Sequence, residues 1–155
     1  MARRLVGLIS DTHGLLRPEA VQALQGSDLI VHAGDIGKES VLTALRAVAP
    51  VTAVRGNVDK GVWAQGLPRT EALEIDQVRV YVIHDIQELD LVPEVAGFKV
   101  VVSGHSHQPS IHECRGVVFV NPGSAGPRRF NLPVSLARMS VQDASVEVSL
   151  LALDV

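Results

Sequence analysis

The chain has 155 residues, 46% hydrophobic and 20% charged, which predicts a single domain, residues 1–155, with a sizeable core and excludes a disordered chain. Its net charge of −3 and aromatic content of 3% lack the basic surface and stacking rings of nucleic-acid-binding proteins, so no nucleic-acid partner is expected. One cysteine excludes an intrachain disulfide, and no apolar stretch reaches the ~18 residues of a membrane helix. The first apolar run meets Asp11 too early for a secretory leader, and we expect a cytoplasmic protein with no membrane partner.

The first sixty residues predict strands and helices in alternation. Strands are expected at 3–9, 28–35 and 51–57, and helices at 17–24 and 38–48. Pro18 suits a first helical turn, and Val41, Leu42, Leu45 and Val48 form one apolar side of the second helix. A β-α-β-α-β order implies a parallel sheet with helices packed on it.

The second half predicts mainly strands. Segments 71–76 and 78–84 are expected to form a tight hairpin, and a short helix is expected within 88–96. Further strands are expected at 98–104, 110–114, 117–123, 134–141 and 145–153. The whole pattern predicts an α/β fold with two packed sheets, the first mostly parallel and the second mostly antiparallel.

Seven polar side chains directly follow apolar runs, most of them beside a glycine. They are Asp11, His13, Asp35, Asn57, His84, His105 and His107. Each has an ordinary explanation by itself, such as helix capping by an aspartate or turn formation at Asn57. Seven at the edge where α/β sheets bind ligands indicate one joint site. Mixed oxygen and nitrogen ligands suit Mn, Fe, Co, Ni or Zn, and seven suit two ions that share a bridging carboxylate.

Six short motifs occur in a fixed order along the chain. They are "SDTHG" (10–14), "HAGD" (32–35), "RGNVD" (55–59), "IHD" (83–85), "GHSH" (104–107) and "NPGS" (121–124). Their order and spacing resemble those of the calcineurin-like metallophosphoesterases, in particular the small single-domain bacterial and archaeal phosphodiesterases. The resemblance covers about residues 4–153.

The resemblance implies a fold and a ligand assignment. The fold is a four-layer α/β/β/α sandwich of two mixed sheets flanked by helices, with a dinuclear site at the sheet edge. The first ion would be held by Asp11, His13, His107 and Asp35. The second ion would share Asp35 and take Asn57, His84 and His105. The same seven residues would form the catalytic site.

The implied activity is that of a metal-dependent phosphodiesterase with a metal-bridging hydroxide as nucleophile. Manganese is the expected metal, with nickel, cobalt, iron or zinc as alternatives. Two divalent ions less the charges of Asp11 and Asp35 leave +2, which a hydroxide and a monoanionic diester neutralise. A small-molecule phosphodiester is therefore the expected substrate, and homo-oligomerisation stays open.

Two positions depart from the family pattern. Val58 stands where many relatives have a histidine that helps to protonate the leaving group, and such a general acid typically contributes ~10²–10⁴-fold. Asp59 is the nearest replacement, but it would have to be protonated. Asp85 follows His84 where relatives usually have glycine, and it would lower the charge of the site.

Two other functions remain open from the sequence. The first is a non-catalytic scaffold that keeps the fold and binds proteins, although a scaffold would be free to lose ligands and all seven are present. The second is a dinuclear amide hydrolase, against which only the family resemblance argues. His32 matches no family ligand and is expected to pack or to bond locally, and His112 is expected to be a surface residue.

Overall fold

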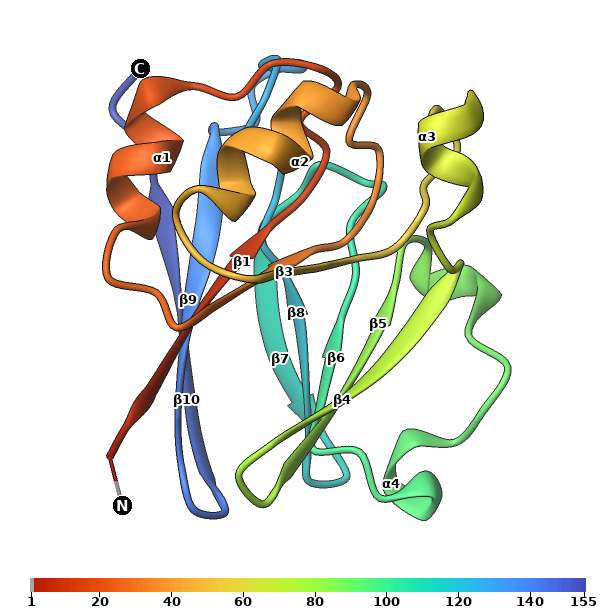
Figure 1. Ribbon diagram of the computed structural model, residues 1–155. Helices are drawn as coiled ribbons and strands as arrows, with labels where there is room; N and C mark the ends of the chain where they lie inside the picture. Colours follow the sequence, from red (N-terminus) through yellow and green to blue (C-terminus); the bar gives the residue numbers. More distant parts are fainter. Residues whose placement is uncertain (1) are drawn as a thin grey trace.

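A computed structural model describes residues 2–155 and shows two five-stranded sheets packed face to face (Figure 1). Sheet A has the order β10-β9-β1-β2-β3, and sheet B the order β4-β5-β6-β8-β7. The strands of sheet A are β1 (Arg4–Ile9), β2 (Leu29–His32), β3 (Val51–Ala53), β9 (Ser135–Gln142) and β10 (Ser145–Ala152). Those of sheet B are β4 (Thr70–Ile75), β5 (Val78–Ile83), β6 (Val100–Val102), β7 (Ser110–Cys114) and β8 (Val117–Asn121). The helices are α1 (Pro18–Leu24), α2 (Glu39–Arg46), α3 (Val62–Gln65), the 3₁₀ turn η1 (Ile86–Glu88) and α4 (Pro93–Ala96).

Both sheets are mixed, which confirms the sandwich implied by the resemblance and corrects the strand directions expected from the pattern. In sheet A, β1, β2 and β3 are parallel, while β9 lies antiparallel to β1 and to β10. In sheet B, β5, β6 and β8 are parallel, and β4 and β7 are antiparallel edge strands. The pattern did not predict that β9–β10 joins sheet A, because the connection 122–134 carries the chain back to that sheet and a hairpin's own sequence does not say which sheet it joins.

The inner faces of the two sheets form the main core. Along β1, Val6 and Leu8 point inward, while Gly7 and Ile9 point outward, as strand alternation requires. The partners of these inward residues are mostly valines of sheet B, and β6 is buried along its whole length. A strand buried on both faces must be central in its sheet, which is why its three valines lie between β5 and β8.

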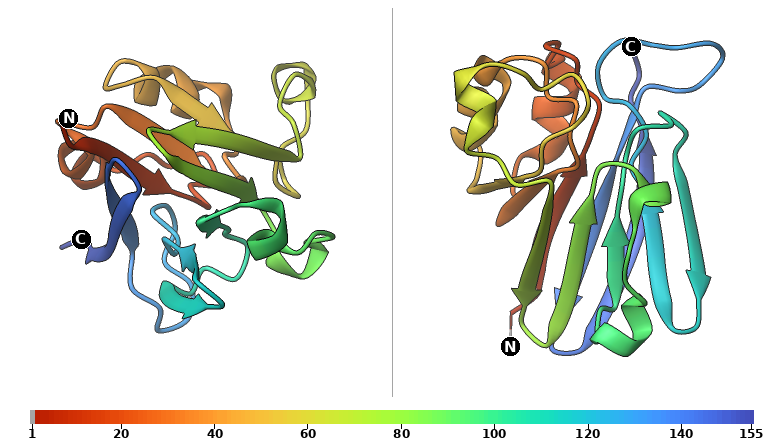
Figure 2. Two further views of the ribbon diagram at one scale, coloured as in Figure 1. Left: turned by 90° about the horizontal axis from the view of Figure 1, so that it is seen from below. Right: turned by 90° about the vertical axis from the view of Figure 1, so that its right-hand side faces the viewer.

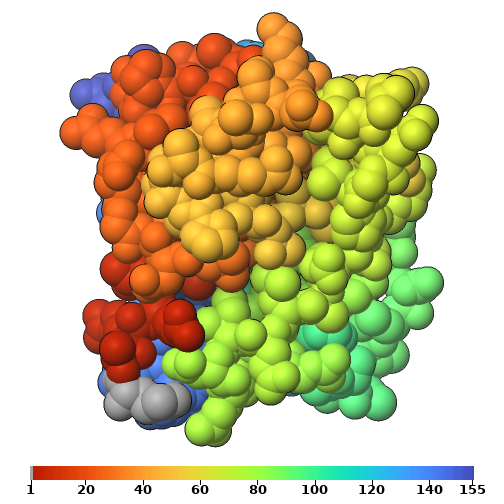
Figure 3. Space-filling model, in the orientation of Figure 1, coloured from red at the N-terminus to blue at the C-terminus, as the bar shows by residue number. Residues whose placement is uncertain are grey.

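Helices α1 and α2 cover the outer face of sheet A (Figure 2), and this part of the chain forms the upper left and centre of the view in Figure 3. Helix α1 packs so closely on β1 that a Cβ added at Gly7 would lie 2.3 Å from the Leu24 side chain. The outer face of sheet B is covered more thinly, by the segment 86–98, which contains η1 and α4. With eight residues α2 is the longest of these helices, and none of the helices within residues 2–155 could span a membrane.

The carboxyl ends of the parallel strands of both sheets meet at one edge of the sandwich (Figure 1). The tight turns between β4 and β5, between β7 and β8 and between β9 and β10 lie at the opposite end. β3 stops at Ala53, short of the predicted end at residue 57, so that "RGN" belongs to the loop beyond it. That loop contributes one side of the site and leads into α3, a helix that the sequence pattern did not predict.

Candidate metal centre

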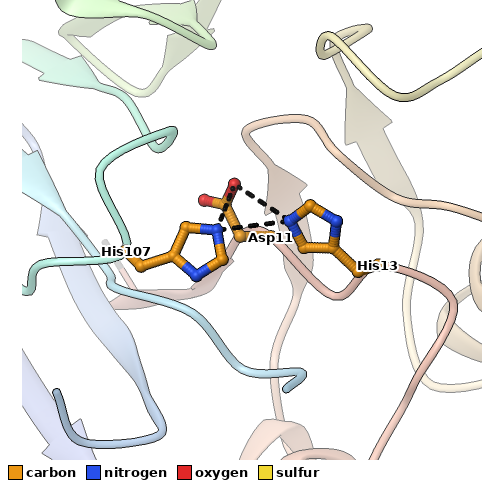
Figure 4. A group of neighbouring side chains, drawn as sticks. All are labelled: Asp11, His13 and His107. Atoms are coloured by element: carbon orange, nitrogen blue, oxygen red, sulfur yellow. Dashed lines mark hydrogen bonds and ion pairs between the residues drawn. The ribbon is translucent and has the colours of Figure 1, made fainter. Parts of the chain in front are cut away.

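The loops beyond the strand ends bring six of the seven predicted ligands into two groups of three. Asp11, His13 and His107 form the first group (Figure 4). Asp35, His84 and His105 form the second. Within each group the ligand atoms all lie within 4.8 Å of one another, as the donors around one metal ion must.

In the first group two imidazoles face one carboxylate oxygen. The Nε2 atoms of His13 and His107 are 3.2 Å apart, and they lie 3.8 Å and 3.5 Å from Asp11 Oδ1. The other oxygen of Asp11 accepts hydrogen bonds from Ser10 Oγ (2.7 Å) and from the His105 amide (3.1 Å). Asp11 Oδ1 is buried and has no hydrogen-bond partner within residues 2–155. A buried carboxylate oxygen in that state is costly, and a cation at the point where the three side chains meet would satisfy it.

The second group is joined to the first through Asp35. Its Oδ2 lies 3.2 Å from His84 Nε2 and 3.7 Å from His13 Nε2, so one carboxylate oxygen faces a histidine from each group. Its Oδ1 accepts a hydrogen bond from the Val58 amide (3.0 Å). His84 Nδ1 lies 2.8 Å from the Ala33 carbonyl and must donate to it, which leaves Nε2 to face the site.

Asn57, the seventh predicted ligand, lies on the outer side of the second group. Its side chain is exposed, and it lines the same cavity as His84. The structure therefore places all seven residues at one edge of the sandwich. Their roles as ligands remain a proposal.

The backbone at these loops is held in an uncommon conformation. Five of the seven residues have positive φ: Asp11 (55°), His13 (46°), Asp35 (56°), His105 (71°) and His107 (64°). Left-handed backbone costs roughly 1–2 kcal/mol at a residue with a side chain, and it concentrates at functional sites. The motifs predict which residues come together at the site, but nothing in the sequence predicted a strained backbone at so many of them.

Burial and mutual contacts shift the proton affinities of the groups. Burial raises the pKa of Asp11 to about 6, although the Ser10 hydroxyl opposes the shift. Burial lowers the pKa of His13, and it lowers that of His107 to about 4 with help from the charge of Arg129. Both imidazoles are therefore neutral at pH 7 and can offer nitrogen lone pairs to a cation.

The Asp35–His84 contact behaves in the opposite way. Burial alone would raise the pKa of Asp35, but His84 and the Val58 amide outweigh it and hold this pKa below its usual range. Burial would lower the pKa of His84, yet Asp35 raises it to about 9. In the metal-free protein the His84 proton thus faces the shared carboxylate, and a bound cation would take the place of that proton.

Further polar residues, which the ligand pattern did not assign, hold the loops in place. Asn121 Nδ2 donates to the Gly104 carbonyl (2.9 Å), and the Ser124 hydroxyl donates to the Asp11 carbonyl (2.8 Å), so "NPGS" ties the two histidine-bearing loops to each other. Asp59 is buried and accepts from the amides of Gly37 and Gly56, both at 2.9 Å. With both oxygens engaged as acceptors, Asp59 is a structural residue, and its suggested role as a proton donor is wrong.

His32 bonds locally, as expected from the sequence. The Gly34 amide donates to its Nδ1 (3.1 Å), so the ring proton sits on Nε2, 3.0 Å from the Thr12 hydroxyl. The Thr12 hydroxyl in turn donates a hydrogen bond to the Ile36 carbonyl (2.9 Å). The chain of bonds joins the loop after β1 to the loop after β2 with every polar atom satisfied.

Asp85 and His112 were not expected to be metal ligands, and both line a cavity beside the second group. Asp85 caps η1 by accepting from the Gln87 amide, and its Oδ2 lies 3.8 Å from His105 Nε2. His112 is exposed, as expected, but it stacks on Phe119 with ring centres 5.1 Å apart, and both rings line a cavity of about 180 Å³ that reaches His105.

Comparison with known proteins decides the family. The calcineurin-like phosphoesterase superfamily domain matches residues 5–144, and a probable metallophosphoesterase of Methanocaldococcus jannaschii is 39% identical over 152 residues, 90% of this chain and 77% of that protein. The chain belongs to the calcineurin-like phosphoesterase superfamily. Among solved structures, a novel archaeal phosphodiesterase shares 20% identity with a TM-score of 0.78, over 95% of this chain and 99% of that one. Vps29 of Entamoeba histolytica complexed with Zn²⁺ shares 23% with a TM-score of 0.76, over 96% and 98%.

Because the chain belongs to this superfamily and carries two groups of candidate ligand atoms, it is assigned as a metal-dependent phosphoesterase. The two solved structures establish a shared fold, because their identities are too low to carry more. The sandwich of a calcineurin-like phosphoesterase can therefore be assigned to the whole described chain, and its chemistry has to be argued from the site.

Proposed function

We propose that the protein is a phosphodiesterase that uses two divalent metal ions, one in each group of ligands. The observation that carries this proposal is the position of Asp35 Oδ2, 3.7 Å from a histidine of the first group and 3.2 Å from a histidine of the second. A carboxylate between two sets of donors is the arrangement that lets two ions lie close together.

The residues fit the two ions in number and in kind. Asp11, His13, His107 and Asp35 would hold the first ion. Asp35, Asn57, His84 and His105 would hold the second. Divalent ions at these positions would supply Lewis-acid activation of a water molecule and of the phosphoryl oxygens. Oxygen and imidazole donors without a thiolate suit manganese first, and nickel, cobalt, iron or zinc as alternatives.

The protein's own residues fix the geometry and the charge of this site. Ser10 and the His105 amide orient Asp11, and the Val58 amide orients Asp35, so each carboxylate turns one oxygen to the centre. Two carboxylates offset half of the charge of two divalent ions, which suits a monoanionic diester together with a hydroxide better than a dianionic monoester.

Two cavities support a substrate with two arms. One, of about 190 Å³, is lined by Asn57 and His84, and the other, of about 180 Å³, by Asp85 and His105. They adjoin the second group on either side of the segment 83–88, whose residues contribute to both walls. A phosphodiester carries two substituents on phosphorus, and the pair of cavities offers one to each.

The test combines metal content with hydrolysis. Protein loaded with Mn, Ni, Co, Zn or Mg is expected to retain two ions per chain by elemental analysis. It should also hydrolyse bis(p-nitrophenyl) phosphate faster than p-nitrophenyl phosphate. Asp35→Asn is expected to lose both ions and nearly all activity, whereas Asn57→Ala should lose one ion and keep measurable activity.

A folded protein that retains no metal would contradict the proposal. Retention of two ions without hydrolysis of any diester or monoester would instead support the scaffold alternative. Equal and mild effects of the two variants would show that Asp35 does not bridge.

A further inference from the structure

The cavity beside Asn57 and His84 carries two arginines, and we call it the arginine cavity. It is lined by Arg55, Asn57, Arg69, Thr70, Tyr81, Ile83, His84, Glu88 and Asp90. Its volume of about 190 Å³ is below the ~300–1,000 Å³ of pockets that enclose a whole small molecule. It therefore has room for one chemical group of a substrate that extends from the metal centre.

The main chain brings the two arginines together. The amide of Arg55 donates to the Pro68 carbonyl (2.8 Å), so the loop after β3 runs beside the residue that precedes Arg69. Thr70 then opens β4 and pairs with Ile83, the last residue of β5 before His84. The cavity is thus built on two strand ends, with one arginine two residues before Asn57.

Neither arginine is engaged elsewhere. Within residues 2–155, no carboxylate lies within 4.0 Å of the guanidinium nitrogens of Arg55 or Arg69, and neither side chain donates a hydrogen bond. Other arginines of the chain do have such partners, as Arg115 has with Glu94 and Arg138 has with the Ala23 carbonyl. Five N–H donors on each guanidinium are therefore free to face a ligand.

The chemistry of the wall favours a phosphoryl group. A guanidinium binds phosphate oxygens through two parallel N–H donors, and the hydroxyl-bearing Thr70 and Tyr81 add donors to the same wall. Glu88 and Asp90 also contribute to the wall, but both are exposed, as Arg69 is, so water and salt screen all three charges. The charge of the half-buried Arg55 is screened least.

We propose that the arginine cavity binds a second phosphoryl group, carried on one arm of the phosphodiester substrate. The inference rests on the proposed function, because Asn57 and His84 belong both to the metal centre and to the cavity. The substrate class is then a diester with an additional phosphate, such as a nucleotide diester that also carries a terminal phosphate.

A matched pair of substrates tests the proposal. The p-nitrophenyl ester of thymidine 5′-phosphate is compared with the same ester carrying a 3′-phosphate, as kcat/KM of the manganese-loaded enzyme. The phosphorylated substrate is expected to be preferred by tenfold or more. Arg55→Gln and Arg69→Gln should each reduce this preference by about tenfold, since each removes charge-assisted hydrogen bonds.

Two control variants separate local from general charge effects. Arg115→Gln removes the same charge at the turn between β7 and β8, at the opposite end of the sandwich, and should leave the preference unchanged. Glu88→Gln removes a negative charge from the cavity wall and should increase it. A wild-type preference near one, or a preference that both arginine variants leave intact, would overturn the proposal.

A binding measurement without metal keeps the test independent of catalysis. Inorganic phosphate is titrated into EDTA-treated protein while the side-chain Nε–H signals of Arg55 and Arg69 are followed by NMR. Saturable shifts of both signals are expected, with no shift for Arg115. If neither ester is hydrolysed, the proposed function fails, but these shifts would still establish the phosphate subsite. Their absence up to 50-fold molar excess would overturn it.

Discussion

Val58 shows how one residue can both support the site and limit its chemistry. Its amide donates to Asp35 Oδ1, so its backbone orients the shared carboxylate, while the residue as a whole is 46% exposed at the rim of the site. A valine cannot donate a proton, and Asp59 beside it has both oxygens committed to backbone amides. The leaving group must therefore depart without protonation by either residue.

We expect the rate of diester hydrolysis to fall steeply as the pKa of the leaving alcohol rises. Val58→His should change little with p-nitrophenolate and should speed alkoxide leaving groups by tenfold or more, because a general acid typically contributes ~10²–10⁴-fold. Rates for a series of aryl and alkyl diesters measure this. Val58→Gln, which is polar but cannot act as an acid, is the control, and a flat series for the wild type would show that another group supplies the proton.

At this scale the sequence was most informative about the seven proposed ligands. All seven lie in short motifs at strand ends, where a local pattern defines a position in space. The residues that hold these side chains and their loops in place were harder to predict. Ser10 and Ser124 are buried and bonded to Asp11, yet serines in loops are common, so their residue type alone carried no signal.

The loops that follow β1, β2, β3 and β6 are the elements on which the site depends. They approach one another so closely that a Cβ at Gly104 would lie 2.1 Å from Ser10 Oγ, and one at Gly56 would lie 2.2 Å from the Asp35 amide. The close approach leaves room only for glycine at these two positions. Left-handed backbone at the proposed ligands lowers stability in favour of a fixed geometry. A substitution that relieves this strain should therefore increase the stability of the metal-free protein.

His105 offers a direct measurement of this strain. Its φ is 71° and its side chain is 45% exposed, so truncation removes little packing. In metal-free protein, His105→Gly is expected to be more stable than His105→Ala by about 1 kcal/mol, because only glycine adopts this backbone freely. Urea unfolding measures the difference between the two variants.

Ala44 in the exposed face of α2 provides the opposite case. There Ala44→Gly should cost about 1 kcal/mol, as in ordinary helices. An alanine that is also preferred at position 105 would mean that the left-handed loop stores no strain in solution.

Most elements could be predicted, because their signals are local. The β4–β5 hairpin, the two helices on sheet A and the apolar run of β6 follow from alternation, helical period and run length. The assignment of β9–β10 to sheet A could not be predicted, since pairing between strands more than a hundred residues apart leaves no mark in either strand.

Each group of ligands draws on both halves of the molecule. Asp11 and His13 follow a strand of sheet A, and His107 follows one of sheet B, while Asp35 comes from sheet A and His84 from sheet B. An ion in either group would therefore tie the two sheets together at their common edge. Without it, cohesion at that edge depends on hydrogen bonds such as the one that links His32 to Thr12.

The buried His32 should make the stability of the metal-free protein depend on pH. Burial lowers its pKa to about 3, whereas an unfolded chain has about 6.5. Between these values the unfolded state binds the proton and the folded state does not, so the free energy of unfolding falls as the pH is lowered. From pH 7 to pH 5 the expected loss is about 2 kcal/mol.

Two measurements isolate this effect from the other groups. The raised pKa values of His84 and Asp11 act in the opposite direction, and the lowered pKa values of His13 and His107 act in the same direction. Urea unfolding at pH 7 and pH 5 is therefore compared between wild type and His32→Gln, which share these other groups. The wild type should lose about 2 kcal/mol more than the variant. In the folded wild type, the NMR signal of the His32 ring should also keep its neutral position down to pH 5. A His32 signal that titrates near pH 6.5 in the folded protein would contradict the bonded neutral ring on which the argument depends.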